Sequence, residues 1–366
     1  MSKIESFLKT FNSKSTVRAY RWALSRFFES VYGHNETSLE EHAEKYLSED
    51  RDYEEDLEGF LANINGEPPK SVRLMISAVR TFLVENDIEL SDKFWRRLRG
   101  RIKGSRALTI DKVPSNAELK QVIMHMPIHG KALYLCLSSS GMRIGEALKL
   151  KLSDIELDKD PPVIHIRGEY TKTGNSRVAF ISREALESLS EWFKVRSKYL
   201  ESASGKSHIF VKDKEDDRVF PFEISTAHVI WRNALAKTGL YKKDSSTNRN
   251  LIHPHVLRKF FRTRLGSVIP TDVAEALMGH EGYLTEVYRR YTVEDLAKFY
   301  KQGEGVLTIF SNAEEVSKLK VEVEEKNKQL QSIINGLVSE NLELKERMAK
   351  VEKILEKIAG ELRGDS

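Results

Sequence analysis

The feature of this sequence that most restricts its fold is a change of pattern between residues 100 and 114. Before it, apolar residues recur at helical spacing, first over residues 16–33 (TVRAYRWALSRFFESVYG), where Ser15 or Thr16 can cap the helix. Residues 100–114 (GRIKGSRALTIDKVP) have two glycines, a proline and no period, which is typical of a linker. We therefore expect a helical bundle over residues 1–103 and a basic linker over 104–114. The further helices predicted in the bundle cover residues 40–47, 57–63, 71–86 and 94–98.

Residues 115–310 combine helical and strand patterns. Ser115 can cap a helix, with Glu118 in the capping-box position. The segments VIHIRGEY (163–170) and SRVAFIS (176–182) alternate like strands and flank TKTGN, where Gly174 and Asn175 suit a hairpin turn. HIFV (208–211) reads as another short strand, and the other periodic segments read as helices. The fold class that we expect is mainly α, with one small antiparallel sheet.

The tail, residues 311–366, has a different pattern. Apolar residues recur every seven positions, at Val316, Val323, Leu330, Leu337, Leu344, Val351 and Ile358. These are the d positions of a coiled-coil helix, and asparagines at two a positions, Asn327 and Asn341, would fix its register and strand number. The alternative is one long helix packed on its own domain. We favour self-association, because the tail is polar outside this seam.

The amino-acid composition says more about where in the cell the protein is located than about what it does. With 40% hydrophobic residues the chain can bury a core, and its net charge of +4 does not by itself indicate nucleic acid. The single cysteine, Cys136, excludes a disulfide framework, and we find neither a signal-peptide core nor a membrane span. We expect a soluble, cytoplasmic protein that contacts no membrane.

One basic run stands out. Six of the eleven residues from 96 to 106 are basic, and they can neutralise DNA phosphates: Arg96, Arg97, Arg99, Arg101, Lys103 and Arg106. A solvated helix end would explain the same run.

Four further segments contain the kinds of group that cleavage of a phosphodiester would need. Cleavage needs cationic donors for the non-bridging oxygens, an acid for the leaving oxygen and an in-line nucleophile. Arg143 follows the Gly141 turn at the start of a helix, and Glu146, one turn later, can orient it. The remaining groups are Lys172 at a hairpin tip, His255 and Arg258 three apart on one helix, and His280 in a Gly-His turn followed by tyrosines. Each of these motifs alone is common, but the order in which they follow one another in the chain is specific.

This ordered set resembles the tyrosine recombinase (phage integrase) family, in particular an archaeal-type integrase related to the recombinases that resolve chromosome dimers. The resemblance covers residues 116 to about 300 and extends weakly to the first bundle, which looks like the family's core-binding domain. It implies that residues 115–310 form the catalytic domain. It further implies that Arg143, His255, Arg258 and His280 activate the phosphate, that Glu146 supports Arg143, and that Lys172 is the general acid.

The nucleophile departs from the family pattern. Family members usually place the tyrosine nine residues after the histidine, whereas Tyr288 lies eight after His280, Tyr291 eleven after and Tyr283 three after. We predict Tyr288, with Tyr291 as its rival. Tyr283 is better explained by packing or a DNA contact.

The resemblance implies a site-specific recombinase that acts on double-stranded DNA through a covalent 3′-phosphotyrosyl link, as a tetramer on two sites. It implies no cofactor, ATP or metal, and a role in integrating a viral or other mobile element. Two alternatives share the fold. One is a type IB topoisomerase, which relaxes supercoils without pairing sites, and the other is a catalytically inactive DNA-binding scaffold.

Overall fold

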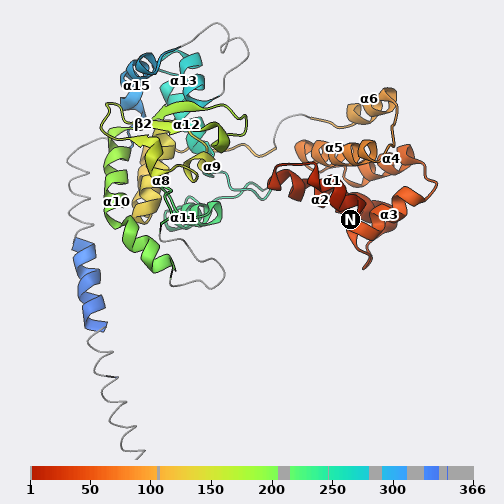
Figure 1. Cartoon of the computed structure of the whole chain (residues 1–366), viewed down its shortest axis with the longest axis horizontal. Helices are drawn as coiled ribbons and strands as arrows, with labels where there is room; N and C mark the ends of the chain where they lie inside the picture. Colours follow the sequence, from red (N-terminus) through yellow and green to blue (C-terminus); the bar gives the residue numbers. More distant parts are fainter. Residues whose placement is uncertain are drawn as a thin grey trace, which may run out of the picture. The chain divides into compact units, whose positions relative to one another are not determined.

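The computed structural model describes residues 2–104, 108–204, 215–245, 247–279, 291–310, 325–337 and 344. Its secondary structure is mainly helical with one three-stranded sheet, which confirms the expected fold class (Figure 1). The chain divides into two units, residues 1–112 with 241–253, and residues 113–240 with 254–366. The roles given above to the bundle, the linker and the catalytic domain stay predictions.

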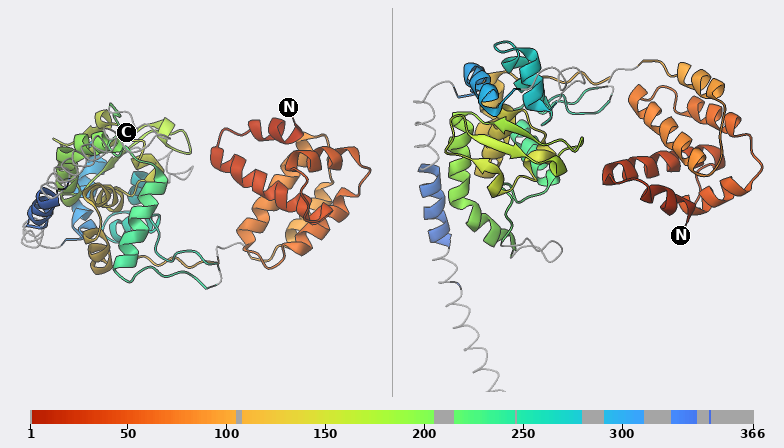
Figure 2. Two further views of the ribbon diagram at one scale, coloured as in Figure 1. Left: turned by 90° about the horizontal axis from the view of Figure 1, so that it is seen from below. Right: turned by 45° about the horizontal axis from the view of Figure 1, so that its top comes forward.

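The first unit is built on six helices, and all five predicted helices are present (Figure 2). One helix at the start was not predicted, and the cap of α2 is Ser13, whose hydroxyl accepts from the Thr16 amide at 3.4 Å, rather than Ser15 or Thr16. Buried aromatic rings from α1, α2, α3, α4 and α5 form one core, in which Phe27 packs against Tyr46 and Phe60. The helices are α1 (Lys3–Lys9), α2 (Lys14–Tyr32), α3 (Leu39–Ser48), α4 (Tyr53–Asn63), α5 (Pro69–Glu85) and α6 (Asp92–Gly100).

Residues 108–112 are not an unpaired linker. The Lys112 amide donates to the Leu251 carbonyl at 2.9 Å, and the Thr109 and Thr247 hydroxyls bond to each other at 2.5 Å. The segment 241–253 therefore pairs with the end of the expected linker. No local pattern indicates such a pairing, because the two segments lie far apart in the sequence.

The second unit combines helices with the small sheet β1 (Ile155–Glu156), β2 (Val163–Ile166) and β3 (Arg177–Phe180). The order is β1-β2-β3, all antiparallel, and Val163 pairs with Phe180 while Ile166 pairs with Arg177. The connection over residues 167–176 includes a 3₁₀ turn, Gly168–Tyr170, so it is longer than the five-residue TKTGN connection that was expected.

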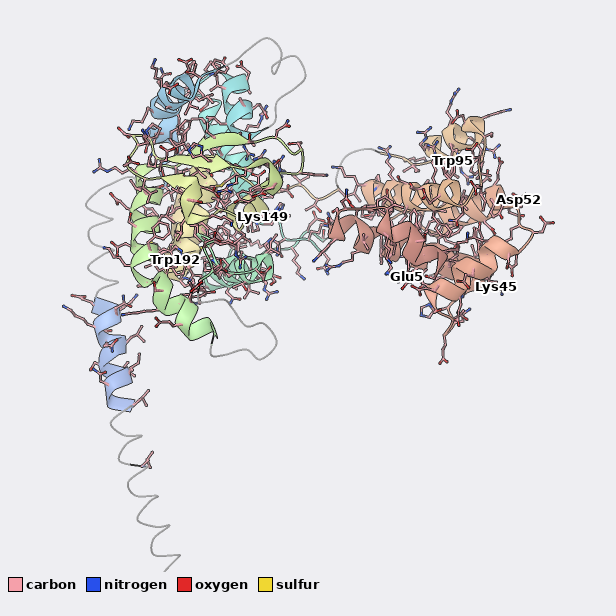
Figure 3. All side chains as sticks on the ribbon, in the orientation of Figure 1. Glu5, Lys45, Asp52, Trp95, Lys149 and Trp192 are labelled. Atoms are coloured by element: carbon pink, nitrogen blue, oxygen red, sulfur yellow. The ribbon has the colours of Figure 1, made fainter. Side chains whose placement is uncertain are left out.

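Helix α8 (Ile128–Ser140) is the central element of this unit, buried along most of its length. Helix α10 (Arg183–Ser204) packs along it, and Trp192 of α10 donates its indole N–H to the Val219 carbonyl at 2.8 Å (Figure 3). The other helices are α7 (Asn116–Met124), with the predicted Ser115 capping box, α9 (Ile144–Ala147), α11 (Ile224–Lys237), α12 (Val256–Leu265), α13 (Thr271–Met278) and α15 (Val293–Leu307).

In the tail, residues 325–337 are helical and exposed along their whole length. Leu330, Ile334 and Leu337 lie on this helix with about half of their surface accessible. The coiled coil stays a prediction, because most of its positions lie outside the described residues, as does the strand expected at 208–211. Among the helices described, none is both long and apolar enough to cross a membrane.

The turn that follows α8 depends on glycine. Gly141 has φ +63°, and a Cβ there would lie 2.5 Å from Cδ1 of Phe261 on α12. We expect Gly141→Ala to lower the free energy of unfolding by about 2–5 kcal/mol, from the left-handed backbone and from overpacking. Gly174→Ala is the matched control, because Gly174 has φ +80° but no atom within 4 Å of the added Cβ. It should lose only about 1–2 kcal/mol, and equal losses in urea unfolding would contradict the steric argument.

Candidate functional site

The candidate site begins at the turn between α8 and α9. Arg143 is the N-cap residue of α9, and its amide and guanidinium both donate to the Glu146 carboxylate at 2.8 Å. Glu146 is only 2% exposed, whereas the Arg143 side chain is 32% exposed. The buried carboxylate therefore holds both the backbone amide and one guanidinium nitrogen of Arg143, while part of the Arg143 side chain stays accessible.

A second arginine, Arg177 on β3, meets the same carboxylate. Its Nη2 donates to Oε2 of Glu146 at 2.6 Å and its Nη1 to Oε1 at 3.3 Å. Arg177 was not predicted as a site residue, because in the sequence it reads as an ordinary charged residue after a turn. Its partner lies 31 positions away, so no local pattern could have revealed the contact.

Arg258, in the first turn of α12, is 3% exposed and joins two helix ends. It donates to the Gly141 carbonyl at the end of α8 and to the Met278 carbonyl at the end of α13, each at 2.5 Å. Its Nε is buried and has no hydrogen-bond partner in the part of the chain described. Helix carboxyl termini carry partial negative charge, so both contacts are favourable to a buried cation.

The three guanidinium groups give this site a positive field. Burial raises the pKa of Glu146, but the hydrogen bond and charge of Arg177, followed by the contacts of Arg143, outweigh burial and lower that pKa. Burial lowers the pKa of Arg258 to about 10, and the charges of Arg143 and Arg177 lower it as well. Arg258 therefore stays protonated at neutral pH while it is repelled by two neighbouring cations, and a bound anion would relieve that repulsion.

Lys172 lies in the loop between β2 and β3 and is exposed. Buried Asp154 holds the base of this loop, because it accepts from Arg167 Nε at 2.7 Å and from the Tyr170 hydroxyl at 2.9 Å. A Cβ on Gly168 would lie 2.2 Å from the Gly174 carbonyl oxygen, so the two ends of this loop approach each other closely at Gly168 and Gly174. The loop that carries Lys172 is therefore fixed at its base.

The remaining predicted residues are placed as follows. His255 is the N-cap residue of α12, three positions before Arg258. His280, Tyr283 and Tyr288 lie outside the described residues, and the last described residue before them is Gly279, which has φ +65°. Tyr291 is described, and its hydroxyl donates to Asp272 at 3.3 Å while its ring meets Phe299 edge-on.

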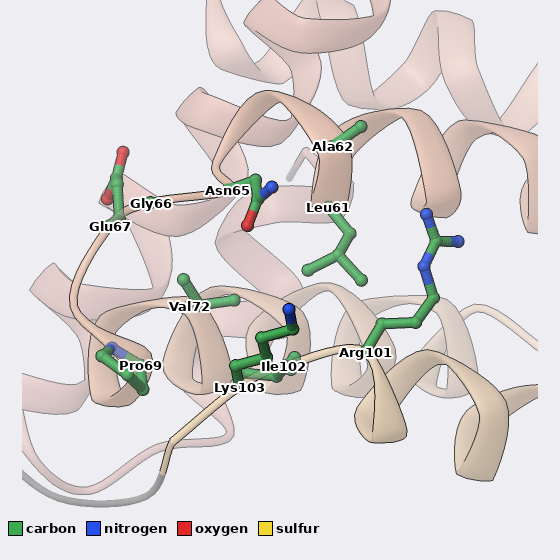
Figure 4. A pocket seen from close by; sticks show the side chains of 10 residues that line it. All are labelled: Leu61, Ala62, Asn65, Gly66, Glu67, Pro69, Val72, Arg101, Ile102 and Lys103. Carbon is green, nitrogen blue, oxygen red and sulfur yellow. The ribbon is translucent and has the colours of Figure 1, made fainter.

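The basic run belongs to α6 and the chain that follows it. Arg97 pairs with Glu58 of α4 at 2.9 Å, and Arg101 pairs with the same residue at 3.2 Å. Arg96, Arg99 and Lys103 are also exposed, and Arg106 lies outside the described residues. Arg101 and Lys103 line a pocket of about 300 Å³, together with residues from the end of α4 and the start of α5 (Figure 4).

The fold and the site together define an α-rich protein in which three guanidinium groups surround one buried carboxylate beside a small antiparallel sheet. The model of the phage integrase family matches residues 112–296, just over half of the chain. The chain therefore belongs to the phage integrase family. This is the family of the tyrosine recombinases, enzymes that cleave and rejoin DNA strands.

Similar proteins agree with this assignment. Tyrosine recombinase XerA of Pyrococcus horikoshii is 24% identical over 301 residues, which covers 81% of this chain and 90% of that protein. The XerA of Thermococcus kodakarensis is 28% identical over 245 residues, covering 65% and 78% respectively. Among solved structures, a lambda integrase (75–356) dimer bound to a COC′ core site matches 80% of this chain and 100% of that one, with a TM-score of 0.51 and 14% identity. The structural likeness supports the fold.

Proposed function

We propose that this chain is a site-specific recombinase that cuts and rejoins duplex DNA through a covalent 3′-phosphotyrosyl link, without metal or ATP. The observation that carries the proposal is the cluster of three guanidinium groups, Arg143, Arg177 and Arg258, around one buried carboxylate, Glu146. A cluster with more positive than negative charge is suited to the extra negative charge of a phosphoryl transition state.

Within this cluster, Arg143 and Arg258 take different parts. The accessible N–H groups of Arg143 donate to the non-bridging oxygens. Arg258 is fixed by its bonds to the Gly141 and Met278 carbonyls, and its guanidinium provides the second cation. Because both side chains are held before DNA binds, little reorganisation opposes the reaction.

The remaining steps of the proposed reaction are assigned to a lysine, two histidines and a tyrosine. Lys172, on a loop fixed at its base, protonates the leaving 5′-oxygen, and His255 and His280 flank the phosphate. Tyr288 attacks the phosphorus, with Tyr291 as the rival. The contact between the Tyr291 hydroxyl and Asp272 supports this order of preference, because that phenol is already engaged.

We propose that DNA is also bound by the basic run of the first unit. Arg97 and Arg101 share Glu58, so their charge is partly compensated. The larger part of the phosphate attraction is therefore assigned to Arg96, Arg99, Lys103 and Arg106.

We further propose that the protein works as an oligomer on DNA, up to a tetramer on two sites. The lambda integrase that it resembles was solved as a DNA-bound dimer. The tail supplies an additional contact between copies, since Leu330, Ile334 and Leu337 form an exposed apolar stripe on a helix with coiled-coil spacing. A second copy of the same stripe would cover it.

The tail contact is testable by sedimentation equilibrium of the full chain. We expect wild type to sediment as a multiple of one chain and the double variant Leu330→Glu/Leu337→Glu as a single chain, because buried charge opposes seam packing. Ser332→Glu, on the same exposed helix but outside the seam, should keep the wild-type mass. A wild-type protein that is monomeric at all concentrations would contradict the proposal.

The function is tested with a library of random-sequence duplexes that carry a nick in one strand, incubated with the protein in EDTA and without ATP. We expect covalent protein–DNA complexes that survive SDS, and sequencing should recover one preferred site. Relaxation of supercoiled plasmid at unrelated sites would instead indicate the topoisomerase alternative. Absence of any covalent complex would favour the DNA-binding scaffold.

A further inference from the structure

Arg177 has an environment that its position at the end of an exposed hairpin does not suggest. Its side chain is 10% exposed and forms a two-pronged ion pair with Glu146, which is 2% exposed. A fork of this kind fixes both the distance and the plane of the carboxylate. Strand β3 therefore determines how the Glu146 carboxylate is oriented.

That carboxylate in turn holds Arg143 by two contacts. Oε2 accepts from the Arg143 amide and Oε1 from its guanidinium, both at 2.8 Å. Each oxygen of Glu146 thus receives one donor from Arg143 and one from Arg177. A change in the tilt of the carboxylate would move the guanidinium of Arg143 with it.

Arg177 also reaches the segment that leads to His280. Its Nε donates to the Leu277 carbonyl at 3.3 Å, next to the Met278 carbonyl that receives Arg258. A Cβ on Gly279 would lie 2.9 Å from Cδ of Arg177, so this turn passes directly over the arginine side chain. One side chain on β3 thereby joins the Arg143 turn to the end of α13.

We propose that Arg177 is a positioning residue of the strand-cleavage reaction, which sets the direction of Arg143 through Glu146 and fixes the turn before His280. This inference rests on the proposed function. The sequence-based prediction gave roles in cleavage to Arg143 and Arg258 and gave none to Arg177. Its guanidinium acts on the phosphate through Arg143 and not by contact.

If the ion pair between Arg177 and Glu146 only stabilised the fold, its loss would not change how the cleavage rate depends on pH, whereas the loss of a positioning contact would. The charged groups around Glu146 are Arg143 of α9, Arg177 of β3 and, at longer range, Arg258 of α12, whose own field includes Glu275 of α13. Burial favours the protonated form of Glu146, and Arg177 is the largest influence that opposes it. Without Arg177 the pKa of Glu146 rises, so Arg143 loses its charged partner as the pH falls.

The test uses single-turnover cleavage by the full chain, on the nicked duplex recovered from the library, over pH 5.5 to 8.5. We expect Arg177→Met to lower the cleavage rate by about 10²-fold, because a misdirected donor costs about that much. DNA affinity should change by less than about threefold, since most phosphate contacts remain. The deficit relative to wild type should widen as the pH falls, and Arg177→Lys should recover part of the rate.

Arg196→Met is the matched control. Arg196 is a partly buried arginine of α10 that donates to the Arg218 carbonyl at 3.0 Å, so its loss tests stability alone. We expect it to cleave at the wild-type rate per folded molecule. The inference is overturned if Arg177→Met cleaves as wild type does, or if its deficit is the same at every pH and is shared by Arg196→Met. If Arg177→Met does not fold, Arg177→Lys, which keeps the charge but not the two-pronged contact, must still cleave more slowly than Arg196→Met, and a wild-type rate in Arg177→Lys then overturns the inference. A wild-type chain that forms no covalent complex contradicts the proposed function instead.

Discussion

Tyr288→Phe should abolish covalent trapping of DNA, with a loss of at least about 10⁴-fold in the amount of complex that survives SDS. The substitution removes one oxygen, which is the atom that we propose attacks the phosphorus. Binding of the duplex should be unchanged, because every arginine and histidine of the site is retained. Gel shift of the nicked duplex measures binding in the same samples.

Tyr291→Phe is the matched control for this result. It removes a hydroxyl whose hydrogen bond to Asp272 lies outside the proposed chemistry, and should keep covalent trapping within about tenfold of wild type. Retention of trapping by Tyr288→Phe together with its loss in Tyr291→Phe would transfer the nucleophile to Tyr291. Trapping by both variants would exclude both tyrosines.

Arg143→Ala should reduce the cleavage rate by about 10²–10³-fold, which is the effect of removing one donor to a developing negative charge. Arg143 is 32% exposed, and Arg177 still pairs with the buried Glu146 carboxylate in its absence, so its loss should change the free energy of unfolding by only about 1 kcal/mol. Single-turnover cleavage and urea unfolding of the same preparation separate the two effects.

Arg183→Ala provides the comparison for Arg143→Ala. The Arg183 side chain is 88% exposed and pairs with Glu187 at 3.7 Å, so its removal should alter neither cleavage nor stability. A wild-type cleavage rate in Arg143→Ala would contradict the assignment of the site. A large loss of stability in Arg143→Ala would mean that its slow cleavage comes from unfolding and not from the loss of a donor to the phosphate oxygens.

The fold was predictable where the sequence signal is local and long. All five helices predicted in the first unit are present, because each carries apolar residues at helical spacing. Short elements gave too little pattern. Helix α1 has only seven residues, and β1 has two. The pairing of Lys112 with Leu251 could not be predicted at all, because it joins segments that are distant in the sequence.

For the candidate site, a contact between residues close in the sequence could be predicted, whereas contacts between residues far apart in the sequence could not. Arg143 and Glu146 lie three apart at the start of a helix, so their contact follows from the local spacing, and the structure has it. Arg177 was missed because its role depends on how β3 is placed against α9. The two carbonyl contacts of Arg258 were missed for the same reason, since Gly141 and Met278 are brought together only by tertiary packing.

The most direct test of the account is to identify the residue trapped on a nicked duplex. The covalent complex is digested with trypsin and nuclease, and the nucleotide-bearing peptide is sequenced by mass spectrometry. We predict a single modified peptide with the nucleotide attached to Tyr288 through the 3′-phosphate of the cleaved strand. A nucleotide on a serine or on any residue other than a tyrosine, or linkage through a 5′-phosphate, would contradict the assignment of this chain's chemistry.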